Sequence, residues 1–509
     1  QLATQQLCYC KRVVMKKIIK RYWLNKKGSL IAVLILTTIL MFCSCPQTIA
    51  SGNTQLNRSV PLKDTSISHF IGEYLSKKRN DLNLYYPNTV QRFYDLGNSQ
   101  AAWVREGSNP KQTWEAMMFL DCVLQYGLAH EDYHQKELLY EPLHTMLEEP
   151  GKIGNREKAK FDILLSDALI TLMNNLHYGK LNPVYTARKV DSGGMIPFHA
   201  ENALFNAQQQ PDFMSAISKV QPKSKIYANM QDHMRLLKGQ YQGDCYEIPE
   251  SEVRKIAINM ERIRWEEVDG NTYIQINIPA YTLKFITPDS VYDFKIIVGK
   301  VSAPTPTLSS NISYMTTYPE WKISQKIFVN EILPKAINNP LYLATNHYSI
   351  YYKNGRYLKP NKTSLLQVKQ HPGLYYASQY GDCDNDPGQI VFKFPSTYGI
   401  NLHDTPEQDL FKKEERALGN YCVRVERAKQ FAELLLKIGN TSAKINLLDN
   451  ALNRRLTRNI SLKTPVPVKI TYLTCIVKKG EVITFKDCYN LDKNLEMALY
   501  NTNLTLTTK

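Results

Sequence analysis

The sequence predicts an α+β protein in which a helical domain precedes a mainly β domain. From about residue 62 to 237, apolar residues recur with a helical period, whereas beyond residue 270 they alternate with polar residues, as is typical of strands. A short polar stretch, residues 239–251, separates these two patterns. With 509 residues, the chain is long enough for two domains and additional terminal segments.

The N-terminal residues predict an export segment. The first 27 residues hold eight lysines and arginines and no acid, which is half of the net charge of +16. The uncharged apolar run 29–45 follows, and basic residues before such a run place the bulk of the chain outside the cytoplasm. We therefore expect a basic cytoplasmic segment (1–28), a transmembrane or cleaved signal segment (29–45), a tether (46–60) and a periplasmic or cell-envelope location. Because this segment explains the basic charge, we expect no nucleic acid partner.

The helical domain is expected over residues 61–250. Pro110 suits the first turn of a helix that closes at Gly127. An apolar stripe from Phe161 to Leu176 predicts a second helix, which ends at Gly179.

The second domain is expected over residues 251–505. The stretches 273–285, 291–299 and 389–395 alternate like strands, and the last of them stops at a proline. In the next strand Leu402 points to the core, so His403 points to the opposite face. We expect a helix over residues 426–439, directly after the short loop 419–425 that holds Cys422.

Cys422 and His403 are the candidate nucleophile and base. A thiol attacks as thiolate, and a neighbouring imidazole or a helix N-terminus favours that form. A spacing of nineteen residues is a weak signal by itself, and an unrelated buried cysteine and strand-end histidine is the alternative interpretation at this point.

Several ordered motifs strengthen this interpretation. LHDTP (402–406), then Phe411, then Arg416-Ala417 and then CVRV (422–425) resemble the active-site region of YkuD-type L,D-transpeptidases, in particular the large YcbB-like branch. The similarity extends over roughly residues 65–500 in further stretches, namely 127–134, 164–183, 256–265, 277–281, 298–300, 305–314, 319–324 and 331–335.

The resemblance implies a peptidoglycan crosslinking enzyme with a helical scaffold domain and a lid at about 345–389. Cys422 would take the acyl group of a tetrapeptide stem with release of D-Ala and pass it to an amine of a neighbouring stem, forming a 3→3 crosslink with His403 as general base. The carbonyl of Asp404 would orient His403, and Arg424 would hold a substrate carboxylate. Backbone N–H groups of Tyr421 and Cys422 would form the oxyanion hole.

The same resemblance implies partners and cofactors. We expect peptidoglycan stem peptides as substrates, carbapenem-class β-lactams as covalent inhibitors and the membrane as a contact of the N-terminal segment. No metal and no organic cofactor is required for the chemistry.

The loop before the nucleophile departs from the family pattern. The family usually reads Ser-His-Gly-Cys, whereas this chain has Gly419-Asn420-Tyr421-Cys422. Asn420 can form hydrogen bonds but cannot titrate, and Tyr421 lacks the backbone freedom of glycine. Asn401 also replaces an aromatic residue that is common two places before the base. The alternatives are therefore an attenuated or inactive wall-binding homologue, or an L,D-carboxypeptidase if water resolves the acyl-enzyme.

A zinc peptidase is a remote alternative. His130, Glu131 and His134 form an HExxH pattern, which on a helix would place two imidazoles on one face around zinc, with the glutamate as base. No third ligand is obvious.

Residues 382–386 imitate the start of a calcium loop, but Pro387 stands where glycine is required, so we expect a turn there. A disulfide between Cys475 and Cys488 is left open.

Overall fold

The structure is a computed structural model that describes residues 66–77, 79–105, 110–149, 151–239, 250–265, 270–319, 321–323, 325–346, 348–354, 356–379 and 388–500. The expected N-terminal segments and the calcium-like stretch lie outside the described residues. Within the described part, no helix is long and apolar enough to cross a membrane. The chain divides into two compact units, each of which is coherent by itself.

The first unit is helical, as the sequence predicts. It comprises the described residues up to Val123 together with those of His130–His177 and Ala187–Gln221. Its helices are α2 (Ile67–Lys77), α3 (Pro87–Leu96), α4 (Pro110–Asp121), α5 (Tyr140–Glu148), α6 (Asn155–His177), α7 (Ala187–Ser192), α8 (Ala200–Gln208) and α9 (Phe213–Ser218), with short 3-10 turns η1 (Arg79–Leu82) and η3 (His130–Asp132).

Helix α6 is the centre of this unit, and its polar side chains hold the surrounding segments. Every residue from Phe161 to Leu176 is buried. Asp162 accepts hydrogen bonds from the backbone N–H groups of residues 102–104 and from the hydroxyl of Tyr94. Such buried carboxylates are tolerated because each lone pair has a donor. The helix therefore fixes the connecting segments as well as the other helices.

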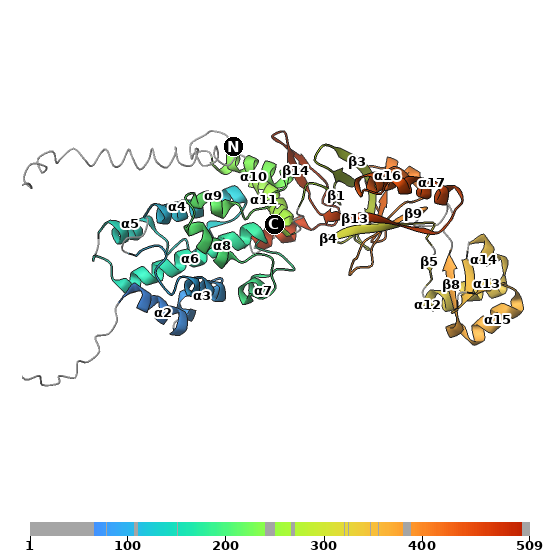
Figure 1. The fold of residues 1–509 in the computed structure, drawn as a ribbon, viewed down its shortest axis with the longest axis horizontal. Helices are drawn as coiled ribbons and strands as arrows, with labels where there is room; N and C mark the ends of the chain where they lie inside the picture. The colour runs from blue at the N-terminus through green and yellow to red at the C-terminus, as the bar shows by residue number, and fades with distance from the viewer. Residues whose placement is uncertain are drawn as a thin grey trace, which may run out of the picture. The chain divides into compact units, whose positions relative to one another are not determined.

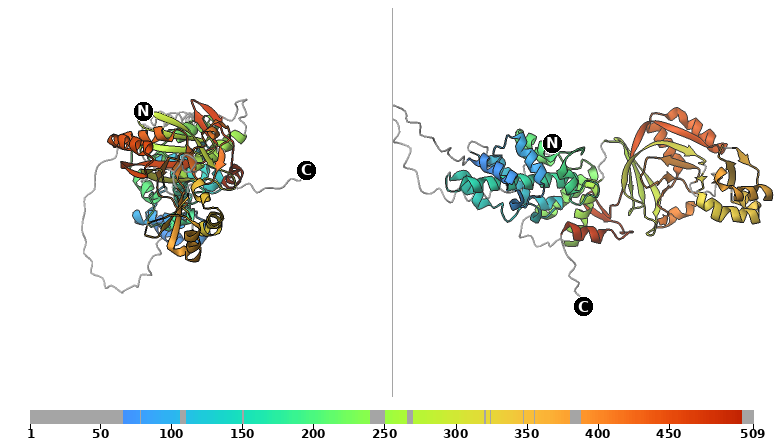
Figure 2. Two further views of the ribbon diagram at one scale, coloured as in Figure 1. Left: turned by 90° about the vertical axis from the view of Figure 1, so that its right-hand side faces the viewer. Right: turned by 90° about the horizontal axis from the view of Figure 1, so that it is seen from below.

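The second unit is built on a closed sheet. Strand β3 (Val291–Gly299) pairs with both β2 and β12, so the order β3-β12-β10-β9-β4-β13-β1-β2 returns to β3, while β11 pairs with one end of β3. The remaining strands of the sheet are β1 (Tyr273–Asn277), β2 (Thr282–Ile286), β4 (Leu308–Thr317), β9 (Ile390–Lys393), β10 (Leu402–His403), β11 (Ala417–Gly419), β12 (Val423–Val425) and β13 (Arg458–Thr471). Figure 2 shows the curvature of these strands.

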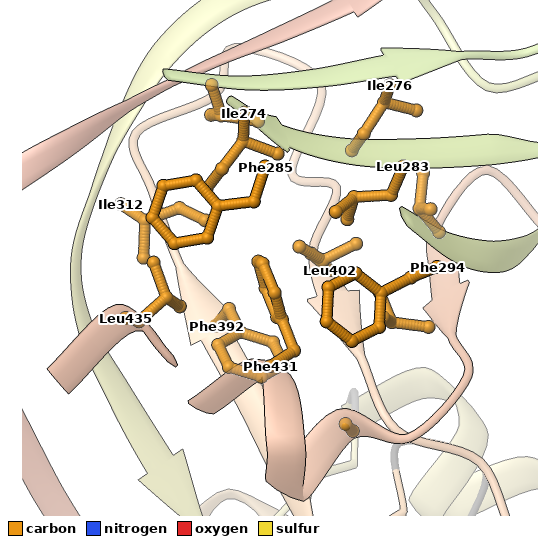
Figure 3. Packing of buried hydrophobic residues seen from close by; sticks show 14 of the residues in the cluster. Ile274, Ile276, Leu283, Phe285, Phe294, Ile312, Phe392, Leu402, Phe431 and Leu435 are labelled. Atoms are coloured by element: carbon orange, nitrogen blue, oxygen red, sulfur yellow. The ribbon is translucent and has the colours of Figure 1, made fainter. Parts of the chain in front are cut away.

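The alternating residues that predict the strands form the core of this sheet. Ile274, Phe392 and Leu402 are all fully buried in one cluster. Helix α16 (Ala428–Ile438) covers this core, and Phe431 packs against Phe392 with ring centroids 4.8 Å apart (Figure 3). The 3-10 turns η6 (Gln408–Lys412) and η7 (Ser442–Lys444) and helix α17 (Ile445–Asn453) complete this part of the unit.

A second layer of the same unit consists of two helices and a hairpin. Helices α10 (Lys225–Gly239) and α11 (Glu250–Trp265) pack with β14 (Cys475–Lys478), which forms a hairpin with β15 (Glu481–Thr484), and with α18 (Asp492–Leu499). The described residues from Pro222 onward form this unit together with Leu124–Ala129 and Tyr178–Thr186. The buried methionines of α10 belong to the same apolar cluster as α11 and the hairpin.

The region that includes the expected lid has its own four-stranded sheet and its own apolar cluster, and Figure 1 shows its helices gathered around β5 and β8. Its strands pair in the order β5-β8-β6-β7. The apolar cluster of this region begins at Phe328, so the folded element starts well before the expected residue 345. Its elements are β5 (Trp321–Lys322), α12 (Gln325–Ile327), the π-helical turn η4 (Phe328–Ile332), α13 (Leu333–Asn338), α14 (Leu341–Thr345), β6 (Tyr348–Tyr352), β7 (Tyr357–Leu358), α15 (Lys362–Gln370), η5 (Pro372–Leu374) and β8 (Tyr375–Gln379).

Asp162→Ala should destabilise the helical unit by about 3–5 kcal/mol, because it leaves three buried backbone N–H groups without an acceptor. Urea denaturation measures this free energy of unfolding. Asp95→Ala is the matched control, because Asp95 is exposed and its carboxylate accepts from Gln91 on the same helix, so its effect should stay within about 0.5 kcal/mol. Equal effects of the two variants would contradict the anchoring role of Asp162.

Candidate active site

Strand pairing brings the two candidate catalytic residues to neighbouring strands. Strand β10 lies between β9 and β12 and pairs with β12 in parallel, with His403 opposite Arg424. Cys422 is the residue directly before β12, and the N–H of Val423 donates to the carbonyl of Asn401 at 3.0 Å. The sheet thus places Cys422 beside the residues that lead into His403.

A short strand separates Cys422 from the expected helix. We expected this helix over residues 426–439, and α16 occupies Ala428–Ile438, after Arg427 in a left-handed conformation with φ +52°. Strand β12 was not predicted, and its residues Val423 and Val425 are buried in the sheet core. Along the chain, β12 thus lies between the thiol and the N-terminus of α16.

His403 is buried and held by the backbone. Its Nδ1 lies 2.6 Å from the carbonyl oxygen of Asp404, which is the contact implied by the resemblance. A carbonyl only accepts, so Nδ1 carries the proton, and the neutral ring has its lone pair on Nε2. Gly388 packs so closely on Asp404 that a Cβ at this position would lie 2.7 Å from the Asp404 carbonyl carbon. The orientation of the imidazole therefore rests on main-chain packing.

The carboxyl group of Asp404 serves a different purpose from its carbonyl. It accepts from the N–H of Gln389 at 3.2 Å and is largely buried, and burial raises its pKa while the N–H groups of Gln389 and Thr405 oppose that rise. The carboxyl therefore fixes the backbone around residue 404, whereas the carbonyl of the same residue contacts His403.

The thiol of Cys422 accepts a hydrogen bond from the sheet. The backbone N–H of Asn401 lies 3.3 Å from its sulfur. The side-chain oxygen of Asn401 in turn accepts from the Nζ of Lys393 on β9 at 3.1 Å. A donated N–H and a nearby cation both favour a thiolate over a thiol.

The loop before Cys422 contains a tight turn in which a tyrosine takes the place of glycine. Tyr421 has φ +59°, and the N–H of Cys422 lies 2.6 Å from the carbonyl of Asn420, closing a three-residue turn. The N–H of Tyr421 donates to the carbonyl of Ala303 at 3.0 Å. The two N–H groups expected to form the oxyanion hole are thus already bonded within the protein, and they need to turn before they can serve a substrate. Asn420 is exposed.

Gly299 allows this loop to approach the sheet. A Cβ at Gly299 would lie 2.1 Å from the carbonyl oxygen of Ala303 and 3.0 Å from the nitrogen of Tyr421. Thr305 adds a second connection, because its hydroxyl donates to the carbonyl of Tyr421 at 2.8 Å. The end of β3 therefore determines where the nucleophile loop lies.

Arg424 is engaged by an acidic residue of the chain. Its guanidinium forms an ion pair with Glu407, while the arginine side chain is only 11% exposed and the glutamate 57%. The resemblance implies that Arg424 holds a substrate carboxylate, and the structure places the carboxylate of Glu407 on this group instead. The carboxylate of Glu407 thus binds Arg424 where the resemblance implies a carboxylate of the substrate.

The HExxH residues do not form a zinc site. The 3-10 turn η3 includes only His130–Asp132, so the two histidines are not on one face of an α-helix. His134 is buried with Nε2 at 2.6 Å from Asp167, whereas His130 lies against the carbonyl of Asp121 at 3.2 Å. Among the described residues no group of three or more His, Cys, Asp or Glu side chains could hold a metal ion. The geometry expected for a zinc peptidase is therefore wrong for this segment.

The described cysteines are thiols. Cys475 and Cys488 do not form a disulfide with each other. Burial raises the pKa of Cys475 to about 12, and burial also raises that of Cys488. Neither is suited to act as a nucleophile near neutral pH.

Sequence reasoning missed Lys393 and Glu407. Lys393 interrupts the apolar run of β9, and its Nζ donates to the side-chain oxygen of Asn401. Strand alternation could have placed it beside Asn401. Glu407 follows a proline in a loop, where no periodic pattern indicates its direction.

Comparisons with known proteins identify two domains in this chain. A family model described as "Scaffold domain" matches residues 88–234, and one described as "L,D-transpeptidase catalytic domain", named YkuD, matches residues 271–468, a range that includes His403 and Cys422. A Haemophilus influenzae protein named "Putative L,D-transpeptidase" is 26% identical over 369 residues, which cover 71% of this chain and 72% of that protein. The chain therefore joins a helical scaffold domain to a mainly β catalytic domain of the YkuD family of L,D-transpeptidase domains.

Proposed function

We propose that this protein is an exported L,D-transpeptidase that forms 3→3 crosslinks in peptidoglycan, with Cys422 as nucleophile and His403 as general base. The observation that carries the proposal is the pairing of β10 with β12, which sets the oriented imidazole of His403 opposite Arg424, on the strand that begins directly after Cys422. Membership of the family supports the substrate class. The N-terminal basic and apolar segments support a location in the cell envelope.

The proposed reaction has two steps. The Cys422 thiolate attacks the carbonyl carbon at the third residue of a tetrapeptide stem, the bond to the terminal D-Ala breaks, and the departing amine takes the proton that His403 received from the thiol. A side-chain amine of a neighbouring stem then attacks the thioester and gives its proton to His403, and the bond to sulfur breaks. One amide bond is exchanged for another, so no oxidant, metal or organic cofactor enters the reaction.

The altered loop defines the second candidate. Tyr421 holds a backbone conformation that favours glycine, and its N–H is bonded to Ala303. These features predict weak stabilisation of the oxyanion and therefore a low rate of acylation. The corresponding alternative is an attenuated or inactive wall-binding protein. If water resolves the thioester instead of an amine, the product is that of an L,D-carboxypeptidase.

Incubation of the purified protein with a carbapenem, and separately with tetrapeptide muropeptides, distinguishes these functions by mass spectrometry. We expect an adduct on the peptide that contains Cys422, together with crosslinked dimers and released D-Ala. Cys422→Ala should lower turnover by at least about 10³-fold, because nucleophile and base act as a unit. Cys122→Ser, in the helical unit, should leave turnover unchanged. Neither adduct nor turnover would favour the wall-binding alternative, and tripeptides without dimers would favour the carboxypeptidase.

Asp404→Asn should retain activity within about threefold, because the imidazole is oriented by the residue's carbonyl, which the substitution leaves in place. His403→Asn should lower the rate of acylation by about 10²–10⁴-fold, because it removes the general base. Stopped reactions followed by mass spectrometry of the acyl-enzyme measure both rates. A loss in Asp404→Asn as large as in His403→Asn would show that the carboxylate itself acts on His403.

Glu407→Gln should lower KM for a tetrapeptide stem, because it leaves the Arg424 guanidinium to the carboxylate of the substrate. An exposed ion pair contributes up to about 1 kcal/mol, so the change should be about two- to fivefold. Glu415→Gln removes an exposed glutamate that pairs with Lys486 and is the matched control, with no expected change. Steady-state kinetics measures the effect, and a raised KM in Glu407→Gln would contradict competition for Arg424.

A further inference from the structure

Lys393 is a cationic residue of the candidate site to which the proposed reaction gives no role. Strands β9 and β10 pair antiparallel, with Phe392 opposite Leu402 and Val391 opposite His403. The next pair in this register is Lys393 and Asn401, and the Nζ of Lys393 donates to the side-chain oxygen of Asn401 at 3.1 Å. The lysine is half-buried, so its charge is only partly screened by water.

Asn401 connects Lys393 to the nucleophile. Its side-chain oxygen accepts from Lys393, and its backbone N–H donates to the sulfur of Cys422 at 3.3 Å. The ammonium is therefore held by the same residue whose backbone contacts the thiol. Burial lowers the pKa of Lys393, whereas the charge of Cys422 acts to raise it, which is consistent with attraction between the two groups.

The other titratable groups around the thiol do not duplicate this charge. His403 on β10 is neutral when it acts as a base, and Arg424 on β12 is paired with Glu407. Tyr314 on β4 lies opposite Lys393 in the sheet. Among the residues that the structure describes, no carboxylate forms an ion pair with Lys393, so its positive charge is directed toward Asn401 and the region of the thiol.

We propose that Lys393, positioned by Asn401, stabilises the thiolate of Cys422 and so raises the fraction of enzyme that is ready for acylation. This inference rests on the proposed function, in which the Cys422 thiolate is the nucleophile. Lys393 is a positioning residue that acts through the charge state of Cys422. The thiol proton passes to Nε2 of His403, the S–H bond breaks, and the thiolate remains beside the ammonium of Lys393.

The test is the pH dependence of Cys422 alkylation by iodoacetamide, followed on the Cys422 peptide by mass spectrometry in the full-length protein. In Lys393→Met the alkylation profile should shift upward by about one pH unit, so that the rate below the thiol pKa falls about tenfold. Lys393→Arg should restore the profile, and Asn401→Ala should shift it upward to a smaller extent. Lys284→Met, the same substitution elsewhere on the sheet, should leave the profile unchanged.

The outcomes separate this role from the proposed function. Thermal unfolding is measured for each variant, and Lys393→Gln replaces the methionine variant if the latter does not fold. An unchanged alkylation profile in a folded Lys393 variant overturns the inference, as does an equal shift in Lys284→Met. Because alkylation requires no stem peptide, an unchanged profile in a chain that still forms crosslinks removes only the role of Lys393. A shifted profile in a chain that forms none removes only the proposed crosslinking.

Discussion

The parallel pairing of β10 with β12 is the constraint on which the candidate site depends. Strand β10 has only two residues, so its position comes from β9 on one side and β12 on the other. Leu402 and Val423 are opposite each other and buried in the core, and a slip by one residue would turn His403 into that core. The core thus fixes the register, and the register determines which side chains lie beside the thiol.

Strand periodicity predicted the direction of His403. The features that the sequence did not predict depend on contacts between residues that are far apart in the chain. The alternation around Leu402 correctly predicted that His403 faces away from the core, because that pattern is local. The short segment after Cys422 was predicted as a loop and is strand β12, since three residues are too few to show a period and their strand character comes from pairing with β3 and β10. The early start of the lid was missed because Phe328 and its neighbours belong to a core completed only far along the chain.

The nucleophile loop shows how backbone strain and hydrogen bonds oppose each other at this site. A left-handed conformation costs a non-glycine residue about 1–2 kcal/mol, and Tyr421 adopts one. The bonds from its N–H to Ala303 and from Thr305 to its carbonyl offset that cost. The same bonds hold the amide away from a substrate oxyanion. In the proposed reaction, the conformation of this loop determines whether backbone N–H groups can donate to the negatively charged oxygen of the tetrahedral intermediate.

The cations of the site differ in what their surroundings allow them to do. Arg424 is nearly buried, and its acidic partner Glu407 lies at the surface, where water can replace it at low cost. A substrate carboxylate can therefore take over this ion pair with little change in the net charge of the site. Lys393 has no such partner among the described residues, and its contact with Asn401 directs it toward the sulfur. One cation is thus available to exchange partners with an arriving substrate, while the other acts on the thiol before any substrate arrives.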